Sequence, residues 1–314
     1  MRGREDGAFR PLLGSRSGLG VLVNMIHSRQ SRIAPYLFVA PNVLGFVAFI
    51  VVPAVYGFWL SLFRTSLFQP PKFAGLGNFT YLANDDIFWR ALRNTVVFVA
   101  GDVALIIILS VLVGTLLNQS IRGRGFFRSA FFYPVLLSPV VVAIVWQWIL
   151  NNRFGALNSI LRATGLRPAP WLLNVDWAMA WVIIVHVWAT VGFFALIVLA
   201  GLQSIPPVLY EAAEVDGATS WRRFWRITLP MLLPTLATVL ILGLIRAFEI
   251  FDYVYVLTGG GPGFATTMMV QYIYRAGFEL DQFGLAAAGS LVLFVIVLSL
   301  TALQYVLGRI GEAL

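Results

Sequence analysis

The sequence has no cysteine, one lysine and two histidines among its 314 residues. Without cysteine, neither a disulfide framework nor a thiolate metal site can form. The two histidines, His27 and His186, have no partner at the spacing of metal ligands, so we expect no metal site on this chain. Charged residues make up only 11%, against about a quarter in soluble globular domains.

The single lysine also bears on nucleotide binding. A phosphate-binding P-loop ends in Gly-Lys-Ser/Thr, whereas Lys72 follows Pro71. The sequence therefore predicts no standard ATP site and no cofactor on this chain. Energy for any work would have to come from a partner protein or from an ion gradient.

Apolar residues are abundant, at 59%, and the mean hydropathy is +0.84. A helix of about 20 apolar residues crosses a bilayer, and a segment in lipid must satisfy its own backbone hydrogen bonds. The sequence thus predicts an all-α integral membrane protein with six transmembrane helices. The expected spans are 36–62, 94–118, 127–150, 178–201, 231–257 and 284–307.

Residues 1–35 are rich in arginine and glycine, and we expect them to form a partly disordered cytoplasmic segment before a transmembrane domain over 36–314. The first apolar run is too long for a cleaved signal peptide. We attribute the net charge of +8 to contacts with anionic lipid rather than with nucleic acid. A cytoplasmic N-terminus places more arginines inside than outside, so both termini and the loops at 119–126 and 202–230 are predicted to be cytoplasmic.

The loop between spans four and five carries the most information. Residues 210–215 favour a short helix, Asp216 and Gly217 favour a stop, and Ser220 is a candidate cap for a second helix over 221–228. Small alanines beside acidic residues suit the docking of a helix into a groove on another protein. The plainer interpretation is an amphipathic loop that only connects two spans.

The spacing in this loop is specific. Glu211-Ala212-Ala213 is followed after three residues by Gly217 and after nine more by Ile-Thr-Leu-Pro at 227–230. This pattern resembles the signature of the permeases of binding-protein-dependent ABC importers. The segment 75–79 also resembles that family, and the segments 251–263 and 272–278 resemble its carbohydrate-uptake branch. The similarity extends over about residues 36–310.

The resemblance implies a non-catalytic subunit in the cytoplasmic membrane of a bacterium or archaeon. Its partners would be a second permease, different from this chain, two cytoplasmic ATPase subunits that hold ATP and Mg²⁺, and an extracytoplasmic solute-binding protein. The transported solute would be a sugar or a related polar compound. The ATPase contact would comprise Glu211, Ala212, Ala213, Asp216, Gly217 and Arg222.

Charged residues inside spans are costly and usually functional or paired. Arg246, Glu249 and Asp252 follow one another at three-residue steps, which places them on roughly one face of a helix. Two interpretations stay open: a polar wall of the translocation path, or an Arg246–Glu249 ion pair that fixes this helix. Asp102, His186 and Gln147 are further candidates for the path, although a lone polar residue more often forms a hydrogen bond between helices.

The glycine-rich segment 259–263 predicts a flexible turn on the outer side. By resemblance, Gly260, Gly261 and Pro262 would contact the binding protein, or this loop would dip toward the pore.

Other classes of protein make different demands. A secondary transporter would be driven by an ion gradient and typically contains an inverted repeat, which we do not detect. A membrane enzyme would need a cluster of catalytic side chains, and a channel would need a filter loop. Within the importer class, glycerol phosphate or a glycerophosphodiester is the alternative to a sugar.

Overall fold

The computed structural model describes residues 35–66, 69–120 and 122–313, and of 305–313 only the backbone. The prediction for residues 1–34 therefore lies outside the described part. The chain divides into two compact units, 1–57 and 58–314. In the first unit the described residues are helical from Pro35 onward, with a π-helical turn, η1 (Val47–Val51), followed by α2 (Val52–Leu60), which continues into the second unit.

Five helices are long and apolar enough to cross a membrane among the described residues. They are Pro35–Leu60, α4 (Asp86–Asn118), α8 (Val175–Gln203), the continuous helix Ser220–Phe248, and α14 (Phe283–Ala313). The helix Ser220–Phe248 comprises α10 (Ser220–Arg223), the π-helical η3 (Phe224–Thr228) and α11 (Leu229–Phe248). A sixth span is present only if the bent pair described next counts as one crossing.

The third predicted span, 127–150, is not one straight helix. It consists of α5 (Arg124–Phe132) with the 3₁₀ turn η2 (Tyr133–Leu136), and then α6 (Pro139–Ile149), which are bent by 99° relative to each other. The bend has a local cause, because a residue before proline is pushed out of the helical region. Leu137 and Ser138, ahead of Pro139, both lie outside the helical region, with ψ 146° and 134°.

The fifth predicted span, 231–257, also ends early. Helix α11 stops at Phe248, and α12 (Asp252–Leu257) is a separate short helix. Phe251 between them lies outside the helical region, with φ −136° and ψ −59°. An acidic residue in the first turn is favourable for the new helix, and Asp252 occupies that turn.

The main hydrophobic core of the second unit lies between α4, α8, α11, α6 and α12, and its largest fully buried side chains include Phe98 and Phe194. At Gly192 the backbone of α8 approaches that of α5 so closely that a β-carbon there would lie 1.9 Å from the carbonyl oxygen of Phe131. Glycine is therefore what permits this helix contact.

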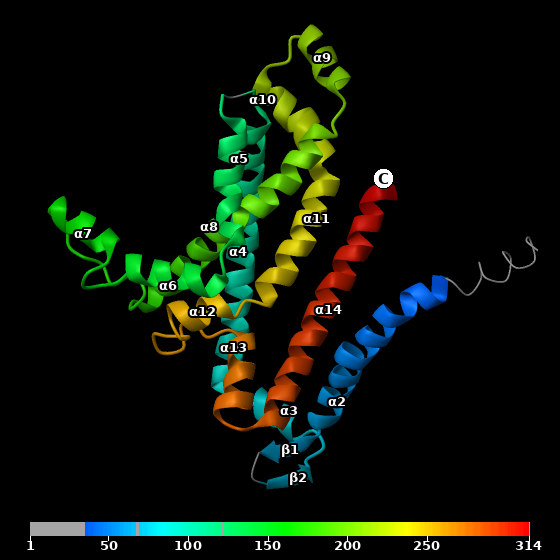
Figure 1. Cartoon of the computed structure of the whole chain (residues 1–314), viewed down its shortest axis with the longest axis vertical. Coiled ribbons are helices and arrows are strands. Elements are labelled where there is room, and N and C mark those ends of the chain that lie inside the picture. The colour runs from blue at the N-terminus through cyan, green and yellow to red at the C-terminus, as the bar shows by residue number, and fades with distance from the viewer. Residues whose placement is uncertain (1–34, 67–68, 121, 314) are drawn as a thin grey trace, which may run out of the picture. The chain divides into compact units, whose positions relative to one another are not determined.

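A second core holds together the end of this unit opposite α9 and α10 (Figure 1). It joins α3 (Gly77–Ala83), α4, α13 (Met269–Tyr274) with the π turn η4 (Arg275–Glu279), and α14. Asp85 caps α4 through the Ile87 backbone N–H and accepts a hydrogen bond from the Tyr272 hydroxyl at 2.6 Å. Burial, and then that hydrogen bond, raise the pKa of the Tyr272 phenol.

An antiparallel hairpin of β1 (Phe63–Ser66) and β2 (Gln69–Phe73) adds a small amount of strand to the predicted all-helical fold. Helix α7 (Ala156–Ala163) follows α6. The remaining helix, α9 (Pro207–Val215), belongs to the functional loop described next.

Candidate functional site

The loop between α8 and α11 forms the helix, turn and helix that its sequence predicts. Helix α9 is closed by Asp216, and Gly217 follows with φ +68°. The Ala218 N–H donates to the Ala213 carbonyl at 2.8 Å, as in a glycine-terminated helix end. Gly217 is needed at this position because L-residues with a side chain rarely adopt a positive φ.

The predicted cap of the second helix was wrong by one residue. Thr219, rather than Ser220, precedes the helix, and its hydroxyl accepts a hydrogen bond from the Arg222 N–H at 3.4 Å. Thr219 has extended backbone, which the capping position requires, whereas Ser220 is already helical.

Helix α9 projects from one end of the second unit, beyond the ends of α8 and α11 (Figure 1). Two contacts fix its position: the Tyr210 hydroxyl lies 3.0 Å from that of Thr228, and Glu214 lies 3.7 Å from Arg223. Its outer surface is nevertheless not covered by other described parts of the chain. Val215 is 89% exposed and Val208 63%.

The residues predicted to contact an ATPase lie together on this projection. Glu211, Ala212, Asp216, Gly217 and Arg222 are all exposed, and Ala213 is half-buried. An apolar and acidic helix without cover from its own chain is the kind of surface that a partner's groove binds.

A polar cavity of about 380 Å³ lies where the two interrupted helices meet. The α5–α6 bend contributes Leu137 and Pro139, and the α11–α12 break contributes Glu249 and Asp252. Discontinuous helices around a polar cavity are typical of solute sites in transporters. The lining further includes Arg246, His186, Thr190 and Tyr253.

The three charged residues of predicted span five thus share one cavity, although the prediction of a single helix face was wrong. Arg246 lies in the last turn of α11, Glu249 directly follows that helix, and Asp252 begins α12. The Arg246 guanidinium lies over the Phe193 ring, 4.3 Å from its centre. Among the described ion pairs, none joins Arg246 to Glu249.

Asp102 and His186 form a hydrogen-bonded pair that the sequence analysis did not predict. The Asp102 Oδ1 atom lies 2.6 Å from His186 Nδ1, joining α4 to α8 where both residues are buried. The second carboxylate oxygen has no hydrogen-bond partner among the described residues. Only His186 borders the cavity. This geometry therefore gives Asp102 the role of a hydrogen-bond partner between α4 and α8.

We expect Asp102→Leu to destabilise the protein by about 1–3 kcal/mol, because it leaves a buried imidazole without its partner. The double variant Asp102→Leu/His186→Leu should lose less than the sum of the two single variants, since both polar groups are then removed. Thermal unfolding of the purified protein in detergent measures both effects. Strict additivity would contradict a direct interaction between the two side chains.

Gln147 lies away from this cavity. Its side-chain amide donates to the Val256 carbonyl at 2.9 Å, which connects α6 to α12. It borders a separate cavity of about 810 Å³ together with Trp148 and Asn151. Its assignment to the path stays a prediction.

The glycine-rich turn is held by hydrogen bonds, in place of the flexible turn that its composition predicts. The Thr266 hydroxyl donates to the Gly261 carbonyl at 2.7 Å, and the Thr267 hydroxyl donates to that of Gly260 at 3.0 Å. Gly260 is buried, whereas Gly261 and Pro262 are partly exposed. The two threonines that follow the glycines were the signal in the sequence that the prediction missed.

Long apolar helices, two of them interrupted around a polar cavity, and a bare helical projection at one end together define a membrane transport protein. The chain belongs to the family of binding-protein-dependent transport system inner membrane components, whose sequence profile matches residues 86–309.

Relatives of known assignment align over almost the whole chain. The trehalose/maltose transport system permease protein MalF of Thermococcus litoralis is 38% identical, over 92% of this chain and 97% of the relative. The sn-glycerol-3-phosphate transport system permease protein UgpA of Agrobacterium fabrum is 36% identical, over 88% and 94%. A chain of a bacterial ABC transporter that imports the acidic polysaccharide alginate is 27% identical with a TM-score of 0.79, over 91% and 98%.

Proposed function

We propose that this chain is a permease subunit of an ABC importer for a sugar or a related polar solute. The observation that carries the proposal is the bare helix α9 with the complete Glu-Ala-Ala…Gly…Ile-x-Leu-Pro pattern. Carbohydrates are the solutes named for several relatives, and a solved relative is in complex with a periplasmic protein bound to an alginate pentasaccharide.

In this proposal each end of the bundle has its own partner. The end with α9 faces the cytoplasm, together with both termini, and α9 docks on one of two ATPase subunits that bind ATP and Mg²⁺. The opposite end faces an external solute-binding protein, and the turn at Gly260, Gly261 and Pro262 is a candidate contact for it. A second, different permease completes the pathway.

The cavity with Arg246, Glu249 and Asp252 is the proposed part of the solute path on this chain. Its two carboxylates outnumber its single guanidinium, and carboxylates accept hydrogen bonds from hydroxyl groups. A neutral polyhydroxyl compound therefore fits this lining better than a phosphorylated one. Uptake assays with a labelled oligosaccharide and with labelled glycerol phosphate distinguish these solutes.

The docking of α9 is testable by crosslinking, because the chain has no native cysteine. We expect a single cysteine at Ala212 or Ala213 to crosslink to a cysteine in the surface groove of the co-expressed ATPase. The yield should change when ATP binds, since the docked helix transmits the movement.

The matched control is Leu76→Cys. Leu76 is 69% exposed and directly precedes α3, which lies at the end of the second unit opposite α9 (Figure 1), so this variant should give no crosslink to the ATPase. Absence of a crosslink at both alanines, in a complex shown to be intact, would contradict the assignment of α9 and the side of the membrane on which it lies.

A further inference from the structure

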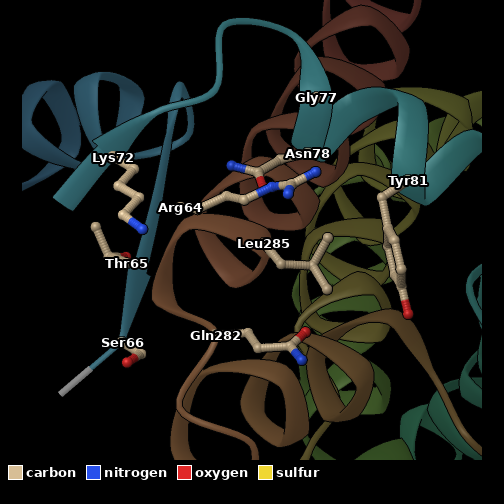
Figure 2. Close-up of a pocket in the computed structure, with 9 residues that line it drawn as sticks. All are labelled: Arg64, Thr65, Ser66, Lys72, Gly77, Asn78, Tyr81, Gln282 and Leu285. Atoms are coloured by element: carbon tan, nitrogen blue, oxygen red, sulfur yellow. The ribbon is translucent and has the colours of Figure 1, made fainter. Parts of the chain in front are cut away.

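A cavity of about 570 Å³ lies at the end of the second unit opposite α9, between the β-hairpin, α3 and the start of α14. Figure 2 shows Lys72 on one side, the Arg64 side chain reaching toward Asn78, and Leu285 and Gln282 below Arg64. The lining contains no carboxylate. The cavity is thus basic and separate from the proposed solute path.

The two cations are direct cross-strand partners in the hairpin. Like charges directly opposite each other destabilise an antiparallel pair. Among the described ion pairs, none includes Arg64 or Lys72. The two residues not described between the strands are leucine and phenylalanine, so they add no countercharge. An anion bound between the two cations would relieve the repulsion.

A further donor is available in the same place. The Thr65 hydroxyl is buried and has no hydrogen-bond partner among the described residues. Thr65 lines the cavity beside Lys72 (Figure 2). The site is held in shape by Asn78, whose amide donates to the Ser61 carbonyl at 2.7 Å and to the Phe63 carbonyl at 2.9 Å.

The position of the cavity along the helices identifies the source of the anion. Helix α2 ends at Leu60 and α14 begins at Phe283, so the cavity lies where spans leave the membrane. The Phe63 ring packs 5.3 Å from that of Phe73, its partner in the same hairpin, and Phe73 is 72% exposed. Exposed aromatic residues at the ends of spans mark the level of lipid headgroups.

We propose that this cavity binds the phosphate of an anionic phospholipid headgroup. Arg64 and Lys72 supply the charge, Thr65 donates a hydrogen bond, and the apolar Leu285 of the lining accommodates the glycerol portion. The inference does not depend on the identity of the transported solute or on which end of the bundle is cytoplasmic.

The test uses the assembled transporter in nanodiscs of phosphatidylglycerol and phosphatidylcholine. After extraction into mild detergent, native mass spectrometry measures the phosphatidylglycerol that stays bound. We expect Arg64→Gln/Lys72→Gln to reduce it by about tenfold or more, since two charge-assisted hydrogen bonds are lost. The charge-conserving variant Arg64→Lys/Lys72→Arg should retain most of the binding and shows that the site still folds.

The matched control is Arg90→Gln/Arg93→Gln, which removes two exposed arginines near the start of α4 outside the cavity. It should change lipid retention by less than about twofold, because Arg90 and Arg93 are exposed like Arg64 and Lys72 but do not line the cavity. An equal loss in this control, or no loss in the cavity variant, would overturn the proposal. Equally tight binding of inorganic phosphate to lipid-free protein would reassign the site to soluble anions. If the cavity variant retained the lipid but no longer captured the solute-binding protein, the cavity would be reassigned as a contact for that protein.

Discussion

Ala212→Trp should reduce ATP-driven uptake by at least about tenfold and should weaken co-purification of the ATPase. Ala212 is exposed on α9, next to Glu211 and within the projection that the rest of this chain leaves bare. A groove that fits a methyl group cannot accept an indole without displacing the helix, and overpacking of a close contact costs about 1–3 kcal/mol. Loss of 1.4 kcal/mol corresponds to about tenfold in binding.

The measurement is uptake of labelled solute into proteoliposomes, together with the amount of ATPase that co-purifies. Ala163→Trp is the matched control, because Ala163 is also an exposed alanine in a short helix, α7. This control should transport normally. Full transport by Ala212→Trp would mean that α9 is not buried against a partner.

Gly192→Ala should destabilise the protein by about 3 kcal/mol or more, the upper part of the range for overpacking. The new β-carbon would lie 1.9 Å from the Phe131 carbonyl oxygen and 3.1 Å from the Phe132 Cα. Both are backbone atoms of α5, so a side-chain rotation cannot relieve the clash. The intrinsic gain of about 1 kcal/mol from alanine over glycine in a helix is too small to compensate.

Gly125→Ala is the control for this substitution. Gly125 lies in α5, and a β-carbon there meets nothing within 4 Å. Its unfolding temperature in detergent should stay the same or rise slightly, whereas that of Gly192→Ala should fall. Similar temperatures for the two variants would contradict the close approach of α5 and α8.

The membrane class and the functional loop follow from the sequence because both depend on local chemistry. Twenty apolar residues have to form a helix in lipid wherever they lie in the chain. The α9 turn rests on Gly217, whose tolerance of positive φ needs no distant contact. Family resemblance then connects the pattern of this loop to transport.

The positions of the helix breaks were harder to predict. Pro139 is visible in the sequence, but prolines are tolerated in membrane helices when neighbours satisfy the freed groups. Pro234 illustrates this, since it lies inside the continuous α11. Whether a proline bends a helix or is tolerated inside it thus depends on the groups packed around it in the fold.

The sequence by itself determined that this chain spans a membrane with about six apolar helices and presents a docking helix between two of them. The tertiary structure alone decided which polar residues meet. Asp102 and His186 are 84 positions apart, yet Asp102 Oδ1 lies 2.6 Å from His186 Nδ1. Arg246 shares a cavity with Asp252 only because α11 ends between them. Arg64 and Lys72 line one basic cavity because the hairpin pairs them directly. Such contacts depend on how helices and strands pack across the fold, which local propensity does not encode.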